Sequence, residues 1–336
     1  MAQPVTDVHD RIELGTWRRE RVGLGEVLDA LAELRRLEHR TATRTSVVNL
    51  VVLATTADEG ERACTTLHEL GGRHPGRTIV LVCDDGAGAP GIDAEVLLHG
   101  AEADGQAVWS EDVTLKVCGP VGEHLDSLVE PLTLPDVPVA VWLVGRLVEP
   151  TNPLLSAADA VLVDTKEAWG EEMPLALANL VRRHTLIDLS WVRLRPWREL
   201  LAGLFEPAPL RPFVTGVARA EVTGKPGPRH LLGGWLVSRL GLPRAAVDLR
   251  DASHSVLRLV AHHDGAVATF TVERLDDKRM LGASARVDGG PSHDDHRALP
   301  DRDLSWSLAA CLTHLERDRA YEEALHAALA WHQGDS

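Results

Sequence analysis

The stretch Ser46-Val-Val-Asn-Leu-Val-Val-Leu-Ala54 is a nearly continuous apolar run. Such a run is typical of a β-strand that is buried on both faces, as in a parallel sheet. Apolar periodicity predicts a helix over 58–70, which Gly71-Gly72 would end, and a second strand over 77–83. Strand, helix and strand with short joints predict a βαβ unit, and therefore an α/β architecture.

The rest of the first half continues this pattern. Further strands are expected over 94–99, 113–118, 139–144 and 160–164, and further helices over 26–40, 122–129 and 172–184. Residues 1–24 are expected to form an irregular arm. We therefore predict an N-terminal arm and helix over 1–45, followed by an α/β domain over 46–207 with a mainly parallel sheet and flanking helices.

The second half has a different pattern. The segments 255–262 and 266–273 alternate apolar and polar residues around His263-Asp264-Gly265, which indicates a hairpin. Further elements are expected as strands over 213–222 and 279–287, a polar loop over 288–300, and helices up to Leu240, over 304–315 and over 322–331. These features predict a smaller α+β domain with antiparallel strands over 208–336, starting at a proline-rich junction.

Composition narrows the classes of function. The formal net charge is −15, from 50 acidic and 35 basic side chains. This balance opposes binding to nucleic acid or to an anionic membrane surface. No apolar run reaches the roughly 20 residues that a membrane-spanning helix needs, and the N-terminus lacks a signal-peptide pattern. Four separated cysteines, at positions 64, 83, 118 and 311, are expected to be buried free thiols in a cytoplasmic protein, and a redox switch between two of them is the alternative.

Several motifs could in principle bind a cofactor, an anion or a metal ion. The turn Cys118–Gly122 has too few glycines for a dinucleotide site, and Pro120 removes a backbone donor. Lys225 and Arg229 flank a turn that could hold an anion or could simply be solvated. Two histidine groups, 262–263 and 293–296, lack the usual spacing of metal ligands. No motif pairs a nucleophile with a base, so no catalytic, cofactor-binding or metal-binding residue is assigned.

Residues 191–198 hold two of the nine tryptophans and three arginines. Pro196 suits the first turn of a helix, and residues 197, 200, 201, 204 and 205 then share one apolar face. We expect this face to pack in the core, against the first domain. The arginines either pair internally with Asp188, Glu199 and Glu206 or contact a partner, since Trp and Arg are enriched at binding hot spots.

This segment resembles a motif of the glucose-6-phosphate dehydrogenase assembly protein family, OpcA. The candidate family-motif or partner-binding residues are Asp188, Ser190, Trp191, Arg193, Arg195, Pro196, Trp197, Arg198 and Glu199. Supporting similarity lies in the turn 74–77, the passage 131–139 and the helix 233–241, so that the resemblance spans about 45–317.

The resemblance implies a non-enzymatic cytoplasmic protein without a cofactor. Such a protein would bind glucose-6-phosphate dehydrogenase, promote its active oligomer or raise its affinity for substrate, and so support NADPH production in the oxidative pentose phosphate pathway. The alternative is an α/β enzyme that binds a sugar phosphate or a nucleotide, with Lys225, Arg229 or the 193–198 arginines gripping phosphate.

Overall fold

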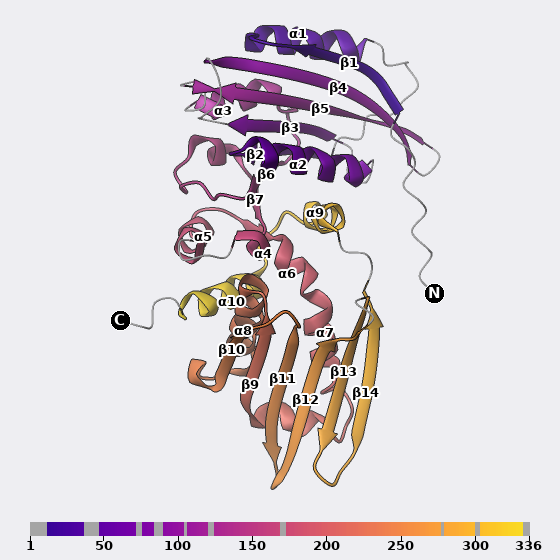
Figure 1. Ribbon diagram of the computed structural model, residues 1–336, viewed down its shortest axis with the longest axis vertical. Helices are drawn as coiled ribbons and strands as arrows, with labels where there is room; N and C mark the ends of the chain where they lie inside the picture. Colours follow the sequence, from indigo (N-terminus) through magenta and orange to yellow (C-terminus); the bar gives the residue numbers. More distant parts are fainter. Residues whose placement is uncertain are drawn as a thin grey trace. The chain divides into compact units, whose positions relative to one another are not determined.

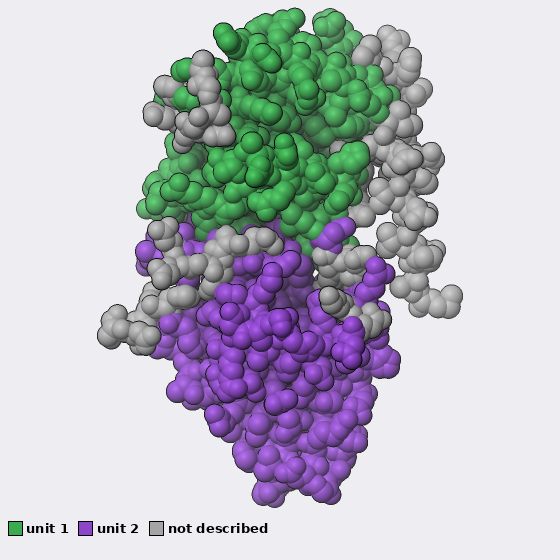
Figure 2. Space-filling view, in the orientation of Figure 1, with its two compact units in different colours: residues 1–163, 183–187, 304–316 green, residues 164–182, 188–303, 317–336 purple. Residues whose placement is uncertain are grey.

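The computed structural model describes residues 12–36, 47–71, 76–83, 90–103, 106–119, 124–168, 173–276, 279–299 and 303–331. The chain forms two compact units (Figure 2). Unit 1 comprises 1–163, 183–187 and 304–316, and unit 2 comprises 164–182, 188–303 and 317–336. The expected division at 207/208 differs from this grouping. Sequence patterns assign domains as continuous segments, whereas this chain passes between the units after residues 163, 182, 187, 303 and 316.

Sheet A of unit 1 has, among the described residues, eight strands in the order β1-β4-β5-β3-β2-β6-β7-β8 (Figure 1). The strands are β1 (Ile12–Arg19), β2 (Val48–Ala54), β3 (Gly76–Cys83), β4 (Gly91–Ala103), β5 (Gln106–Cys118), β6 (Val139–Val144), β7 (Ala160–Val163) and β8 (Leu186–Asp188). Parallel pairing joins β5 to β3, β3 to β2, β2 to β6 and β6 to β7. The prediction of a mainly parallel sheet is therefore confirmed.

The apolar run at 48–54 is central because every residue of β2 is buried. Helix α2 (Ala57–Leu70) contacts β2, β3 and β6; it begins at Thr56, whose hydroxyl accepts from the Glu59 amide, and ends at Gly71. The remaining α-helices described in unit 1 are α1 (Leu24–Arg35), α3 (Leu125–Val129) and α9 (Leu304–Leu312). Because α9 packs on α2, the late segment 304–316 completes the first unit.

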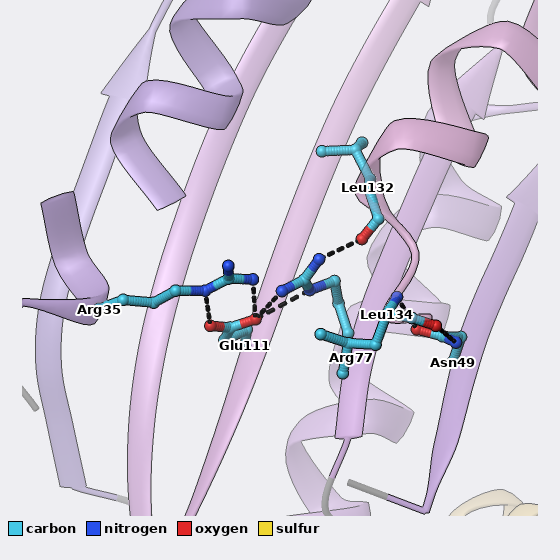
Figure 3. A network of polar contacts seen from close by, with 6 residues as sticks. All are labelled: Arg35, Asn49, Arg77, Glu111, Leu132 and Leu134. Carbon is cyan, nitrogen blue, oxygen red and sulfur yellow. Dashed lines mark hydrogen bonds and ion pairs between the residues drawn. The ribbon is translucent and has the colours of Figure 1, made fainter. Parts of the chain in front are cut away.

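A buried charge network ties one end of sheet A together (Figure 3). Glu111 on β5 accepts hydrogen bonds from Arg77 on β3, with Nε to Oε2 at 2.8 Å, and from Arg35 at the end of α1, with Nε to Oε1 at 2.6 Å. Arg77 is 3% exposed, and it also donates to the Leu132 carbonyl. The buried arginine is thus compensated by a carboxylate and a carbonyl, as burial requires.

Two expectations for this unit need correction. Within the supposedly irregular arm, residues 12–19 form β1, which pairs antiparallel with β4. Strands β4 and β5 are also longer than expected and form an antiparallel hairpin at one side of the sheet. The expected helix over 26–40 is described only as α1, ending at Arg35, because residues 37–46 lie outside the described part.

Sheet B of unit 2 has six strands in its described part, in the order β10-β9-β11-β12-β13-β14 (Figure 1). The strands are β9 (Val217–Gly224), β10 (Val247–Asp251), β11 (Val256–His263), β12 (Ala266–Arg274), β13 (Met280–Val287) and β14 (Ser292–Ala298). Strands β9, β11, β12, β13 and β14 pair antiparallel in that sequence, and the predicted hairpin is β11–β12. Every second residue on the inner strands is buried, so one face of the sheet is packed.

The segment 288–300, expected to be a loop, contains β14. This strand is an edge strand with a largely exposed surface, SHDDHRA, so it lacks the apolar alternation that sequence reading requires. Its charges also discourage pairing with another chain. Strand β10, which pairs in parallel with β9, was likewise not expected.

The α-helices described in unit 2 are α4 (Thr165–Ala168), α5 (Met173–Val181), α6 (Leu189–Arg193), α7 (Arg195–Gly203), α8 (Pro226–Leu240) and α10 (Arg319–Leu329). Helix α7 packs on β12, β13 and β14, and Phe205, just beyond it, stacks on Phe270 of β12 with ring centroids 4.2 Å apart. The predicted apolar face is confirmed, but its packing partner is sheet B rather than the first domain. None of the described helices combines the length and apolarity needed to cross a membrane.

Short 3-10 helices complete the described structure, at Glu130–Leu132, Pro153–Ala157, Arg211–Gly216 and Arg244–Ala246. In unit 2, α8 and α10 approach closely at Gly234, where an added Cβ would lie 2.0 Å from the Ala324 carbonyl oxygen. Gly234 therefore serves helix packing, whereas Gly233 faces β10, where an added Cβ would lie 2.7 Å from Leu249 Cδ2.

Candidate functional site

The tryptophan-arginine segment begins at Asp188, the last residue of β8, which caps α6. Its Oδ1 accepts from the Ser190 amide at 2.8 Å and from the Thr165 amide at 3.3 Å, and the Tyr321 hydroxyl donates to Oδ2 at 3.5 Å. Burial, together with the negative charge of Asp164, raises the pKa of Asp188 to about 7. This carboxyl is therefore a structural cap without solvent access.

A second polar group surrounds Asp164, directly after β7. Its Oδ1 accepts from the Ser190 hydroxyl at 2.8 Å and forms an ion pair with Arg193. The Ser190 hydroxyl in turn accepts from the Lys166 amide at 2.9 Å and from Arg193 at 3.1 Å. These bonds fix the Arg193 side chain, which is 15% exposed.

Trp191 is the centre of a third group. Its indole Nε1 donates to Asp318 Oδ2 at 2.7 Å, and its ring lies 5.8 Å from that of Tyr321. The Arg198 guanidinium lies over the Trp191 ring, with Cζ 3.3 Å from the ring centroid. It also donates a hydrogen bond to the Trp191 carbonyl at 3.2 Å. Burial lowers the pKa of Arg198 to about 10, against the opposing charge of Asp318.

Arg195 and Glu199 lie on the outside of α7. Arg195 Nε donates to Glu199 Oε1 at 2.7 Å, and Arg297 on β14 pairs with the other oxygen of the same carboxylate. The side chains of Arg195 and Glu199 are 73% and 40% exposed, respectively. The hydrogen bond from Arg195 is the main reason that the pKa of Glu199 lies below its ordinary value, and burial opposes it.

The structure thus separates the nine predicted residues. Two, Arg193 and Arg198, are half-buried, and two, Arg195 and Glu199, are exposed; the buried members are Asp188, Ser190, Trp191, Pro196 and Trp197. Internal pairing of the arginines is observed, although Arg193 pairs with Asp164 and not with Asp188. Contact of the segment with a partner protein stays a prediction.

Sequence reasoning missed Asp164, Asp318 and Tyr321. For Asp164 a signal existed, because Asp164 directly follows β7 and Asp188 ends β8, and these strands are neighbours in sheet A. For Asp318 and Tyr321 no sequence signal exists, since they reach Trp191 from α10, more than a hundred residues later.

The structure also brings together two groups of basic residues that the sequence separates. Arg193, Lys225 and Arg229 line one hollow of about 710 Å³ in unit 2. Arg229 is held there by the Gly224 carbonyl at 3.1 Å and by Asp251 at 3.3 Å. The turn between Lys225 and Arg229, a candidate anion site in the sequence, is therefore one wall of a larger basic concavity.

The other motifs take ordinary positions. His262 and His263 end β11, and His293 and His296 lie on the edge strand β14. Among the described residues, no three His, Cys, Asp or Glu side chains gather in a way that could hold a metal ion. Of the four cysteines, Cys311 is buried, Cys83 and Cys118 are half-buried and Cys64 is exposed, which corrects the expectation of burial for all. Residues 120–123 of the glycine turn lie outside the described part.

Comparison with known proteins identifies the class. Residues 67–182 match the family described as the glucose-6-phosphate dehydrogenase subunit N-terminal domain, and residues 184–325 match the corresponding C-terminal domain. The chain is thus of the class that carries both domains of this subunit type. It belongs to the OpcA family.

Two relatives are described as OxPP cycle protein OpcA. The chain is 31% identical to that of Synechocystis sp. over 142 residues, which cover 40% of this chain and 30% of that protein. It is 28% identical to that of Synechococcus elongatus over 178 residues, covering 48% and 39%. The matched stretches therefore span well under half the length of these relatives.

Among solved structures, the super-repressor mutant of Gal80p from Saccharomyces cerevisiae is similar with a TM-score of 0.34 and 8% identity. The similarity covers 79% of this chain and 82% of that one. At this level it carries no argument about fold or function.

Proposed function

We propose that this protein binds glucose-6-phosphate dehydrogenase as a non-catalytic partner and promotes its active oligomer. One observation carries the proposal: family matches to both domains of a glucose-6-phosphate dehydrogenase subunit, which together extend from residue 67 to residue 325. In this role the protein supports NADPH production in the oxidative pentose phosphate pathway, in the cytoplasm.

The mechanism is thermodynamic linkage. A partner that binds the active form of an enzyme more tightly than the inactive form shifts the population by that difference in affinity. A stable interface of this kind would bury about 1,600 Å² in total. The proposal therefore requires a sizeable surface of this chain to be complementary to the active dehydrogenase.

Within the family motif, the exposed residues are the best candidates for that surface. Arg195, Glu199 and Arg297 form a chain of ion pairs that joins α7 to β14 at the surface. The buried members, above all Asp188 and Trp191, hold α6 and α7 in position. We infer that the motif combines a scaffold with a small charged contact surface.

The test mixes the purified protein with its cognate dehydrogenase. Light scattering coupled to gel filtration should show a larger complex, and the dehydrogenase should gain substrate affinity or shift towards its active oligomer. Unchanged oligomer size and unchanged kinetics at micromolar concentrations would exclude the proposal. The protein alone, given glucose 6-phosphate and NADP, should produce no NADPH; turnover would show that it is an enzyme.

A substitution then tests the surface. Arg195→Ala together with Arg297→Ala should weaken complex formation about tenfold, on the scale of charged contacts at interfaces. The matched control is Arg219→Ala, an exposed arginine of β9 in the same unit. Equal affinities of both variants would place the interface elsewhere on the protein.

A further inference from the structure

We propose that the basic hollow of unit 2 is a binding site for a small phosphate monoester with a hydroxylated carbon body, the chemical class of a sugar phosphate. The inference goes beyond the proposed function and does not depend on it, since it concerns a ligand of this chain alone. It rests on the charges, the donors and the size of one concavity.

Charge is the first argument. Among the described residues, the basic side chains that line the hollow are Lys166, Arg193, Lys225, Arg229, Arg274 and Arg279, and the acidic one is Asp276. Two further carboxylates, Asp164 and Asp251, pair with lining arginines. The hollow thus keeps a net positive charge in a chain whose formal net charge is −15. A concavity that gathers one sign of charge concentrates ions of the opposite sign.

Unused donors are the second argument. The side chains of Lys225 and Arg274 are exposed, and neither forms an ion pair with any described residue. Arg229 is 13% exposed, and its Nε is a buried N–H donor without an acceptor in the described structure. Buried donors are normally satisfied, and arginine binds phosphate oxygens with two parallel hydrogen bonds. A phosphate in the hollow would supply acceptors for the exposed side chains of Lys225 and Arg274.

Preorganisation is the third argument. Arg193 is fixed by Asp164 and Ser190, and Arg229 is fixed by Gly224 and Asp251, so both guanidinium groups lose little freedom when an anion binds. Lys225 is the residue that precedes the first turn of α8, where the helix dipole also favours an anion. Because prolines at 226 and 228 lack amide protons, side chains rather than backbone amides would hold the phosphate.

The rest of the hollow indicates the body of the ligand. A volume of about 710 Å³ is within the range of small-molecule sites and far exceeds one phosphate group. Hydroxyl-bearing residues in the lining, Thr223, Ser253 and Ser255, can exchange hydrogen bonds with ligand hydroxyls. Trp197 and Leu232 line the hollow with little exposed area, since each is 4% exposed.

Titration calorimetry on the full chain, without dehydrogenase, tests the proposal with three probes: glucose 6-phosphate, inorganic phosphate and glucose. We expect glucose 6-phosphate to bind at least about tenfold more tightly than phosphate, because charge-assisted and neutral hydrogen bonds add, and glucose to give no detectable heat. Equal affinities for phosphate and the ester would overturn the assignment of the ligand class. No binding of either phosphate compound at millimolar concentration would overturn the site.

Two substitutions locate the site. Arg274→Ala and Lys225→Ala should each weaken glucose 6-phosphate binding about tenfold, as expected for loss of a charged hydrogen bond, and Arg219→Ala should not. Thermal melting of each variant checks the fold, which should be unchanged because the altered side chains are exposed. Affinity that is unchanged by both substitutions would overturn the proposal. Because dehydrogenase is absent, this result is independent of complex formation.

Discussion

The Arg198 guanidinium carbon lies 3.3 Å from the centroid of the Trp191 ring, on the side chain whose indole nitrogen donates to Asp318. Two residues of one sequence motif are thus paired with each other, and α10 is held to α6 through the same tryptophan. The contact makes Arg198 part of the packing of unit 2. A role in binding a partner falls more naturally to the exposed Arg195.

We therefore expect Arg198→Ala to lower the free energy of unfolding by about 1 to 2 kcal/mol, since a partly desolvated cation–π contact and a hydrogen bond are lost. Urea denaturation, monitored by tryptophan fluorescence, measures this change in the free energy of unfolding. Arg195→Ala is the control and should stay within about 0.5 kcal/mol of the parent protein, because exposed ion pairs contribute little. Equal losses in the two variants would contradict the assigned role of Arg198.

The raised pKa of Asp188 predicts an unusual pH dependence. Its pKa of about 7 in the folded protein exceeds the ordinary value of 3.8. Between about pH 4 and pH 7 the folded state holds a proton that the unfolded chain has released. The contribution of this group to the free energy of unfolding therefore decreases as the pH rises through that window, by up to about 4 kcal/mol.

Asp188→Asn should remove this slope, because the amide keeps an oxygen acceptor for the Ser190 and Thr165 amides and cannot ionise. Urea denaturation at pH 5 and pH 8 compares the two proteins. Asp264→Asn, at a side chain that is 90% exposed, is the control and should leave the slope intact. A slope that persists in Asp188→Asn would assign the pH dependence to another group.

Helix contact through Gly234 makes a steric prediction. Gly234→Ala places a Cβ 2.0 Å from the Ala324 carbonyl oxygen, so α8 and α10 must separate, at a cost of about 2 kcal/mol or more. Gly203→Ala is the matched control, because no atom lies within 4 Å of its added Cβ, and alanine should stabilise the end of α7 by up to about 1 kcal/mol. Melting temperatures that fall equally would refute the close-packing argument.

Two of the ion pairs on sheet A, Arg77–Glu111 and Arg18–Glu95, should differ greatly in their contribution to the free energy of unfolding. Glu111→Gln leaves the buried Arg77 without its carboxylate and should destabilise unit 1 by about 3 kcal/mol. Glu95→Gln removes the partner of Arg18, which is 73% exposed, and should cost less than about 1 kcal/mol. Chemical denaturation measures the loss in the free energy of unfolding for both variants. Similar losses would mean that the buried Arg77 finds another acceptor.

Much of the fold could be predicted where burial leaves a periodic pattern. The wholly apolar β2 and the alternating β11 and β12 follow directly from their residues. Strands β1 and β14 could not be predicted in the same way, because their partners, not their own apolar content, define them. The grouping into units depends on contacts between distant segments, such as α9 on α2, which no local pattern encodes.

The candidate site was predicted in part. The helix face of Trp197 follows from the spacing of apolar residues. Internal pairing of the arginines is one of the two alternatives that the cost of burying charge leaves open, the other being contact with a partner. The identity of the pairs does not follow from either argument, because Asp164 and Asp318 are far from the motif in sequence. The meeting of Arg193 with Lys225 and Arg229 in one hollow likewise depends on the position of α8 beside α4 and α6.

The repeated passage of the chain between its two units also has a consequence for biosynthesis. Unit 1 is incomplete until residues 304–316 have been made, and unit 2 is incomplete until residues 317–336 follow. A ribosome adds residues in order, and a contiguous N-terminal domain would normally fold while the rest is still being translated. Here α2 waits for α9, so unit 1 can be completed only after residues 188–303 of unit 2 have been made.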